Sequence, residues 1–215
     1  MQQLLLWSSR RGGKRKGAGR KSPSGEPKLR HEKRAKFTAA QPLHITVKLR
    51  RGLRSLRLAA EQRVVREALA GARDRHGMRI IHFSVLRDHL HLIVEAEHRG
   101  AVTRGMQGLL VRLTKQLNKL WQRRGSILKE RYHDEVIRSP RQARNALRYV
   151  LHNARHHGIE LPCAIDPCSS GQAFDGWANA RFTPQSLPTV VAASVWLLKT
   201  GWRRHGAIGF HEIPR

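Results

Sequence analysis

The sequence predicts an α+β fold, and three observations support this prediction. Polar and apolar residues alternate, as in strands, over residues 44–49, 78–85 and 89–95. Apolar residues recur at helical spacing over residues 57–76, 102–124 and 140–157. A further short strand is expected within residues 127–137. The resulting order is strand, helix, strand, strand, helix, strand, helix. This is the order of the split βαβ, or ferredoxin-like, fold, so we expect an antiparallel sheet with helices on one face. A generic antiparallel sheet with helices on one face is the alternative.

The first half of this pattern contains a strand, a helix and a hairpin. Residues 44–49 are rich in β-branched side chains, which favour strands. The helix predicted for residues 57–76 has Val65 and Leu69 on its apolar face, and Gly77 stands where a helix cap is expected. Strands 78–85 and 89–95 are separated by a tight turn at Arg87 and Asp88. We therefore expect these two strands to form a hairpin.

The second half contains the two most clearly patterned helices. Residues 102–124 carry an apolar stripe that includes Leu109, Leu113 and Leu117, and we expect this stripe to lie in the core. The basic residues on the opposite side either follow DNA phosphates or are simply solvated. Ser139 and Pro140 suit the start of a helix, because serine is a good N-cap and proline fits the first turn. This last helix is expected to end near Gly158.

The domain prediction follows from changes in composition along the chain. Residues 1–41 are expected to form a basic flexible arm, because the stretch 10–21 has seven basic residues in twelve and no apolar period. Such an arm either lies along phosphates or is a solvated tail. Residues 42–160 are the predicted core. Residues 161–215 are the predicted loop-rich and helical C-terminal extension, with a short apolar helix at residues 189–200.

Charge is the dominant feature of the composition. The 215 residues include 42 Lys and Arg but only 15 Asp and Glu, which gives a formal net charge of +27 at pH 7. So much positive charge repels itself unless a polyanion neutralises it. Nucleic acid is the expected partner, and its binding should depend strongly on salt. The oligomeric state is not readable from the sequence, and a homodimer is compatible with it.

Location is predicted from what the sequence lacks. The apolar run 190–198 is interrupted by Ser194 and is about half the length of a membrane-spanning helix, and no signal-peptide core is found. The two cysteines, Cys163 and Cys168, form no disulfide framework, so we expect free thiols in a reducing compartment. These features predict a cytoplasmic, nucleoid-associated protein without a membrane segment.

Two histidines on one strand are the first candidate site residues. His89 and His91 share one face of the predicted strand, because successive side chains point to opposite faces. Residues i and i+2 stand about 7 Å apart, so two imidazoles at this spacing can converge on one metal ion. The alternative is that both histidines face solvent on a half-buried strand.

Tyr149 and Asn153 are the second pair of candidates. Tyr149 lies on the polar side of the predicted helix 140–157, away from the stripe that includes Leu147 and Val150, and Asn153 is its neighbour one turn later. An exposed amphipathic tyrosine is the alternative. A phenol can attack a phosphodiester when a divalent cation polarises the phosphate. Imidazoles and an amide oxygen suit Mg²⁺ or Mn²⁺.

These residues carry a resemblance to a known family. His89-Leu90-His91 resembles the HUH motif (histidine, bulky hydrophobic residue, histidine) of the single-tyrosine, IS200-like transposases. Residues 131–138 resemble the strand that precedes the catalytic helix in that family, and residues 147–155 resemble the helix itself. The most similar branch is that of the REP-associated tyrosine transposases. One departure is Ala154, where the family usually has proline.

The resemblance implies a function and a role for each candidate. It implies a ferredoxin-like core that nicks and rejoins single-stranded DNA next to a hairpin. Tyr149 would be the nucleophile that forms a 5′-phosphotyrosine, and His89, His91 and Asn153 would bind Mg²⁺ or Mn²⁺. Two alternatives stay open: a domesticated, non-catalytic protein that binds structured DNA repeats, and a basic RNA-binding protein. The presence of all four residues favours the enzyme.

Overall fold

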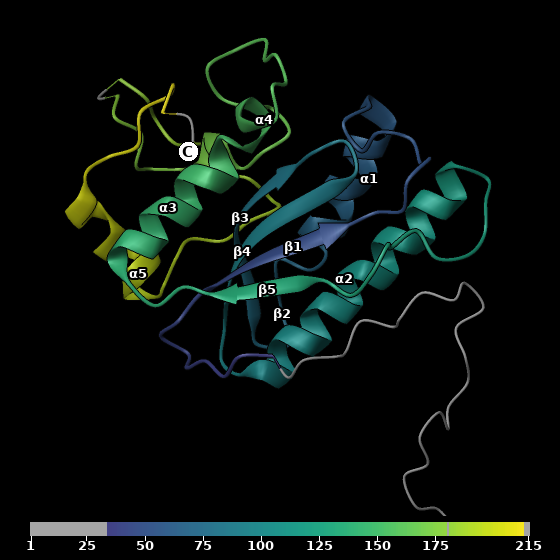
Figure 1. Cartoon of the computed structure of the whole chain (residues 1–215), viewed down its shortest axis with the longest axis horizontal. Coiled ribbons are helices and arrows are strands. Elements are labelled where there is room, and N and C mark those ends of the chain that lie inside the picture. Colours follow the sequence, from purple (N-terminus) through teal and green to yellow (C-terminus); the bar gives the residue numbers. More distant parts are fainter. Residues whose placement is uncertain (1–33, 180, 213–215) are drawn as a thin grey trace, which may run out of the picture. The chain divides into compact units, whose positions relative to one another are not determined.

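The computed structural model describes residues 34–179 and 181–212 of the chain (Figure 1). Most of the predicted basic arm, residues 1–33, lies outside the described residues. The strands are β1 (Leu43–Lys48), β2 (Asp74–Arg75), β3 (Met78–Val85), β4 (His89–Ala96) and β5 (His133–Val136). The α-helices are α1 (Ala59–Ala70), α2 (Arg99–Leu120), α3 (Pro140–Leu151), α4 (Asn153–His156) and α5 (Trp196–Lys199). Two 3-10 helices are η1 (Gly171–Ala173) and η2 (Gly201–His205).

The five strands form one antiparallel sheet in the order β2-β3-β4-β1-β5. If the two-residue β2 is left aside, the order is β3-β4-β1-β5. In the split βαβ pattern these are the second, third, first and fourth strands, so the first strand lies between the third and the fourth. The α+β class and the ferredoxin-like arrangement predicted from the sequence are confirmed. This arrangement matters for function because β1 becomes the direct neighbour of β4, the strand that carries the two histidines.

The expected placement of all helices on one face needs a correction. Helices α1 and α2 cover one face, where Leu90, Leu92 and Val94 of β4 join the larger core. Helix α3 covers the other face and packs, together with α5 and η2, around Ile81 and Ile93. Figure 1 shows the strands between these two groups of helices. The physical reason is that β3 and β4 carry large apolar side chains on both faces, and each face must be shielded from water.

The helix predicted for residues 57–76 is shorter than expected. Helix α1 spans Ala59–Ala70, and the chain then turns back as β2 to pair with β3. His76 and Gly77 connect these strands, and both have positive φ angles, 58° and 73°. Two consecutive left-handed residues are typical of the type I′ turn of a two-residue hairpin. Gly77 therefore belongs to a hairpin and not to the end of a helix.

A β-bulge in β3 decides which side chains face α3. Ile80 pairs with Val94, whereas His82 pairs with Ile93, so Ile81 is an extra residue in the strand. Such a bulge interrupts the alternation of side chains. As a result Ile81 and the neighbouring His82 both contact residues of the second core on the α3 side.

The helix predicted for residues 189–200 forms only at Trp196–Lys199. The preceding residues run along β3, where Val191 N donates to Ile80 O at 2.9 Å. The buried carboxylate of Glu95 accepts hydrogen bonds from the backbone N–H groups of Ser194 and Val195. Several of these residues are β-branched, which disfavours a helix, and the sheet edge and Glu95 satisfy their backbone groups.

Residues 34–41 contact the core although they were assigned to the arm. The Arg34 guanidinium lies 3.6 Å from the centre of the Tyr132 ring and forms an ion pair with Asp134, and Phe37 packs against the larger core. The predicted domain boundaries at residues 41 and 160 stay predictions. Within the described part of the chain, no helix has both the length and the apolar character needed to cross a membrane.

Candidate active site

The centre of the site is His91, in the middle of the sheet. Strand β4 places its side chain on the α3 face, where it is 4% exposed. Its Nδ1 lies 3.0 Å from Nε2 of His44 and 3.1 Å from Oγ1 of Thr46, both on the neighbouring strand β1. Its other nitrogen, Nε2, is buried and has no hydrogen-bond partner among the described residues.

The surroundings of His91 keep its ring neutral. Burial, reinforced by His44, His89, His157 and Lys48, lowers the pKa of His91 to about 2. Burial, reinforced by His133, lowers the pKa of His44 to about 4. A neutral imidazole has one N–H and one bare nitrogen. If Nδ1 of His91 donates to Thr46 Oγ1 or to His44 Nε2, the lone pair lies on Nε2, the nitrogen without a partner.

His89 lies beside His91 at the start of β4. The two ring centres are 5.0 Å apart. Nδ1 of His89 lies 2.7 Å from Oδ1 of Asp88, and this hydrogen bond is the main reason that the pKa of Asp88 is lowered. A carboxylate on one imidazole nitrogen orients the ring and leaves the other nitrogen for a ligand. His157 contacts the same ring, with centres 5.3 Å apart, and both histidines line a pocket of about 530 Å³.

Helix α3 brings Tyr149 to the histidines. The hydroxyl of Ser139 caps the helix by accepting from Gln142 N at 3.2 Å, and Pro140 occupies the first turn. The buried face of α3, which includes Leu147 and Val150, packs on the sheet. The Tyr149 ring is half-buried and meets three imidazoles at centre distances of 5.2 Å for His91, 5.7 Å for His44 and 5.6 Å for His156.

Asn153 follows Tyr149 by one turn. Helix α3 ends at Leu151, and after a turn at His152 the chain continues as α4, so the helical segment is interrupted without the proline that the family usually has. The side chain of Asn153 is fully buried, and neither Oδ1 nor Nδ2 has a hydrogen-bond partner among the described residues. Leaving a buried amide unsatisfied costs roughly 1–3 kcal/mol, so a bound water or a ligand is expected as its partner.

These donors fit a divalent cation. Within residues 34–179 and 181–212, no group of three or more His, Cys, Asp or Glu side chains could hold a metal ion. His91 Nε2 and the amide of Asn153 are buried polar atoms without partners in the described part of the chain, and an imidazole nitrogen and an amide oxygen are common ligands of divalent cations.

Comparison with known proteins agrees with this geometry. Residues 42–151, just over half of the chain, match the family described as IS200-like transposases. The chain belongs to this family. Members of the IS200-like transposase family generally depend on a metal ion. The matched segment includes His89, His91 and Tyr149 and ends just before Asn153.

One solved structure gives a more detailed comparison for this IS200-like transposase. It is a REP-associated tyrosine transposase bound to a REP hairpin. The TM-score is 0.56 at 19% sequence identity, and the alignment covers 78% of this chain and 93% of the other. At this identity the likeness shows the shared fold. No curated protein sequence matches the chain.

Sequence reasoning missed three neighbours of the histidine pair in this transposase: His44, Thr46 and His157. A signal for the first two was present, because His44 and Thr46 alternate with Ile45 and Val47, and the ferredoxin-like order places the first strand beside the third. The sequence pattern does not give the register of these two strands, so it could not show that His44 and Thr46 lie next to His91. His157 gave no such signal, because its position depends on how the chain leaves α4.

Proposed function

We propose that the protein is a metal-dependent single-stranded DNA endonuclease and strand transferase that acts at hairpin-associated DNA. The observation that carries this proposal is the contact of Tyr149 with His91, whose buried Nε2 has no hydrogen-bond partner among the described residues. A tyrosine next to a histidine pair that can bind a metal ion can attack a phosphate polarised by that ion, which an exposed tyrosine elsewhere cannot do. The membership of the transposase family supports the same conclusion.

In this proposal each candidate residue has one role. Tyr149 is the nucleophile, and His89, His91 and Asn153 are the ligands of Mg²⁺ or Mn²⁺. When bound, the cation would polarise the scissile phosphate and offset the charge that develops on it. Asp88 orients His89 through Nδ1, and Thr46 and His44 orient His91 in the same way. These three residues would hold the rings so that the other ring nitrogens could bind the ion.

The proposed chemistry conserves the energy of the phosphodiester bond. The Tyr149 oxygen forms a bond to phosphorus as the bond from phosphorus to the 3′ oxygen breaks. The phenol gives up one proton and the departing 3′ oxygen takes up one, so the products are a 5′-phosphotyrosine and a free 3′-hydroxyl. Attack by a 3′-hydroxyl on the phosphotyrosine reverses these changes and rejoins or transfers the strand.

The proposed substrate is single-stranded or hairpin DNA. The net charge of +27 supports a polyanionic partner, and the similar solved structure holds a REP hairpin. We also infer a cytoplasmic, nucleoid-associated location, a division into residues 1–41, 42–160 and 161–215, and compatibility with a homodimer. Copurification with the nucleoid and limited proteolysis would test the first two of these statements, and sedimentation would test the last.

The decisive experiment is a search for a covalent adduct. The purified protein is incubated with 5′- and 3′-labelled hairpin oligonucleotides taken from repeats that flank its gene, with Mg²⁺, Mn²⁺ or EDTA. We expect a denaturant-resistant adduct on the downstream strand that forms only with the metal. It should be lost in Tyr149→Phe and kept in Tyr132→Phe, which alters the only other tyrosine of the chain.

Two other results would lead to different conclusions. Loss of the adduct in Tyr132→Phe alone would mean that Tyr132 is the nucleophile and that the role of Tyr149 is wrong. Tight, salt-sensitive binding without any adduct would favour the non-catalytic alternative, a protein that holds structured DNA repeats. Preference for RNA of the same sequence would favour the RNA-binding alternative.

A further inference from the structure

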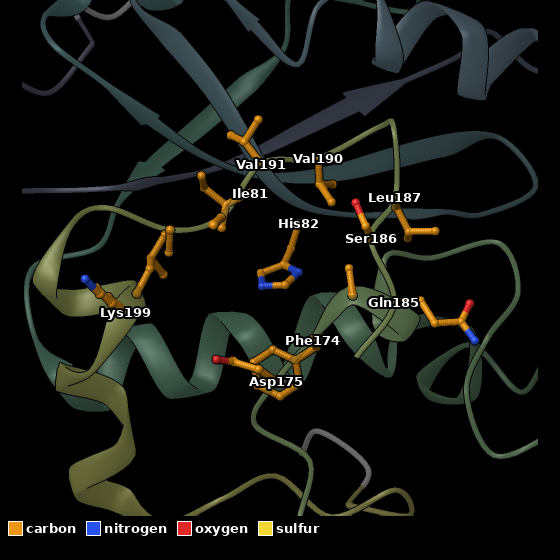
Figure 2. Close-up of a pocket in the computed structure, with 14 residues that line it drawn as sticks. Ile81, His82, Phe174, Asp175, Gln185, Ser186, Leu187, Val190, Val191 and Lys199 are labelled. Atoms are coloured by element: carbon orange, nitrogen blue, oxygen red, sulfur yellow. The ribbon is translucent and has the colours of Figure 1, made fainter. Parts of the chain in front are cut away.

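A second pocket lies on the α3 side of the sheet, beside the bulge in β3. It has a volume of about 390 Å³ and is formed by β3, by the end of η1 with the two residues after it, and by residues 185–187, 190–193 and 198–199. None of the residues proposed for catalysis or metal binding lines it. Its size falls in the range of small-ligand sites. Figure 2 shows the ring of His82 within this pocket, between Ile81 and Phe174.

The inner wall of the pocket consists of two rings in a fixed arrangement. His82 and Phe174 meet edge to face, with ring centres 5.4 Å apart. Nδ1 of His82 lies 3.1 Å from the hydroxyl of Ser170, which fixes the imidazole. Its Nε2 has no hydrogen-bond partner within residues 34–179 and 181–212. Phe174 is 2% exposed and His82 is 8% exposed, so only a small part of these rings can meet a ligand. The second imidazole nitrogen of His82 is the polar atom of the wall that can hydrogen-bond the edge of an unstacked base.

The rim of the pocket supplies both hydrogen-bond donors and hydrogen-bond acceptors. Gln185 and Ser186 are exposed, and each offers a donor and an acceptor. Asp175 also lines the rim, and its Oδ2 forms an ion pair with Arg203 at 2.8 Å. Base edges present donors and acceptors side by side, so this mixture suits a nucleobase better than a purely apolar ligand.

Positive charge stands next to these groups. Lys199 lines the pocket and is exposed, and no ion pair of Lys199 is found among the described residues. An ammonium group at the rim of a base-sized pocket can meet the phosphate that is linked to a bound base. Together with the net charge of +27, this favours a nucleotide of a DNA strand over a neutral metabolite.

The pocket and the candidate active site lie on the same face of the sheet, the face that α3 covers. His82 is opposite Ile93, and Ser84 is opposite His91, so the two sites are two residues apart along the sheet. Two residues of a strand span on the order of 7 Å. One DNA strand can cover this span with a few nucleotides, because each nucleotide adds about 3.4 Å or more.

We propose that this pocket binds one unpaired base of the single-stranded DNA, with its phosphate near Lys199. This inference rests on the proposed function only in that the ligand is single-stranded DNA. It adds a specificity-determining subsite outside the site of cleavage. The bound nucleotide would set which bases are accepted at one fixed position of the substrate.

The test is a scan for the nucleotide that occupies the pocket. Full-length Tyr149→Phe protein in EDTA is titrated with hairpin oligonucleotides in which one unpaired nucleotide at a time is replaced by an abasic site. We expect one position at which the abasic site weakens binding roughly tenfold, as the loss of one or two hydrogen bonds to a base does. 2-Aminopurine at that position should change its fluorescence on binding.

Two pairs of variants connect this position to the pocket. Ala192→Phe places a ring into the pocket from an exposed position of its lining, and Ala178→Phe adds the same ring at an exposed position outside the lining. We expect Ala192→Phe to weaken the binding of the unmodified oligonucleotide and to abolish the protein's preference for it over the abasic oligonucleotide. Ala178→Phe should change neither the affinity nor the preference. Lys199→Gln should weaken binding more than Lys115→Gln, which removes an equal charge from α2.

The outcomes separate this inference from the proposed function. If the wild-type protein forms the Tyr149 adduct but no abasic position matters, or Ala192→Phe keeps the full preference, the pocket does not bind a base and this inference is wrong. If no adduct forms under any condition but Ala192→Phe abolishes the preference, the inference holds and the nuclease function fails.

Discussion

Two residues of the site combine burial with missing partners. Polar atoms in a protein interior are nearly always hydrogen-bonded. The Nε2 of His91 and both amide atoms of Asn153 are exceptions among the described residues. A group that costs stability in the free protein is understandable when a ligand supplies its partner. These atoms are therefore the most informative positions for separating stability from function.

Replacing Asn153 with leucine should separate these two properties. Leucine is similar in volume and has no polar atoms, so Asn153→Leu removes an unsatisfied buried amide. We expect the free energy of unfolding in EDTA to stay the same or rise by about 1 kcal/mol. We expect Mn²⁺ to raise the Tm of the wild-type protein, and this increase should be lost in Asn153→Leu, together with the adduct. Calorimetry with and without Mn²⁺ measures both effects.

The matched control is Asn145→Leu, an exposed amide on α3 that should leave the response to Mn²⁺ unchanged. If Asn153→Leu lowered the stability in EDTA by more than about 2 kcal/mol, the amide would have a structural partner. Its role as a metal ligand would then lose its main support.

His82 should make the stability of the protein depend on pH. Burial lowers the pKa of His82 from 6.5 to about 4, so between these values the unfolded chain binds more protons than the folded one. Stability is therefore complete above pH 6.5 and is lost as the pH falls towards 4, by up to about 3 kcal/mol. His82→Phe keeps a ring in place and should flatten this part of the curve. Urea unfolding at several pH values tests this, and an unchanged slope would show that His82 titrates normally.

At the scale of elements, helix α3 should link stability to the proposed catalysis. Ser139 caps the helix that carries Tyr149, and its hydroxyl accepts a hydrogen bond from Gln142 N. Ser139→Ala should cost about 1 kcal/mol of stability and lower the rate of adduct formation, because the first turn of α3 frays. Ser139→Asp should restore both properties, since aspartate is an equally good cap. An adduct rate that is unaffected by Ser139→Ala would show that the cap does not help to position Tyr149.

The sequence predicted most elements because their signals are local. The period of apolar residues located β3, β4 and α2 to within a few residues, and the Ser139-Pro140 pair marked the first residue of α3. Where tertiary contacts override local preference, the prediction failed. Residues 189–195 are apolar enough for a helix, but Glu95 and the edge of β3 capture their backbone N–H groups.

The site was predictable only in part for a related reason. His89, His91, Tyr149 and Asn153 each stand out by position on a single strand or helix. His44 and Thr46 became visible only through the register of β1 on β4, which pairs Thr46 with His91. Register is decided by packing across the whole sheet, so a pattern in one segment cannot reveal it.

For the molecule as a whole, the net charge of +27 predicts a strong attraction to DNA, the proposed substrate. The fold leaves part of this charge free to act. Lys115, Lys119 and Arg124 are exposed at the end of α2 and beyond it, on the face of the sheet opposite Tyr149. Neutralising phosphates releases condensed counterions, which makes affinity fall as salt rises. The slope of log affinity against log salt concentration therefore reports how many phosphates the basic residues neutralise.

Binding of a hairpin oligonucleotide should weaken about a hundredfold between 50 and 200 mM salt if about five phosphates are neutralised. We expect Lys115→Gln combined with Lys119→Gln to reduce the slope of log affinity against log salt only slightly, because α2 lies on the face away from Tyr149. Fluorescence anisotropy in EDTA with Tyr149→Phe gives these slopes without cleavage. A reduction of about 0.7 for each lysine removed would instead place DNA on α2 and require the substrate to contact both faces of the sheet. A wild-type decrease of less than about tenfold would correspond to only two or three phosphates, and most of the positive charge would then serve something other than this DNA.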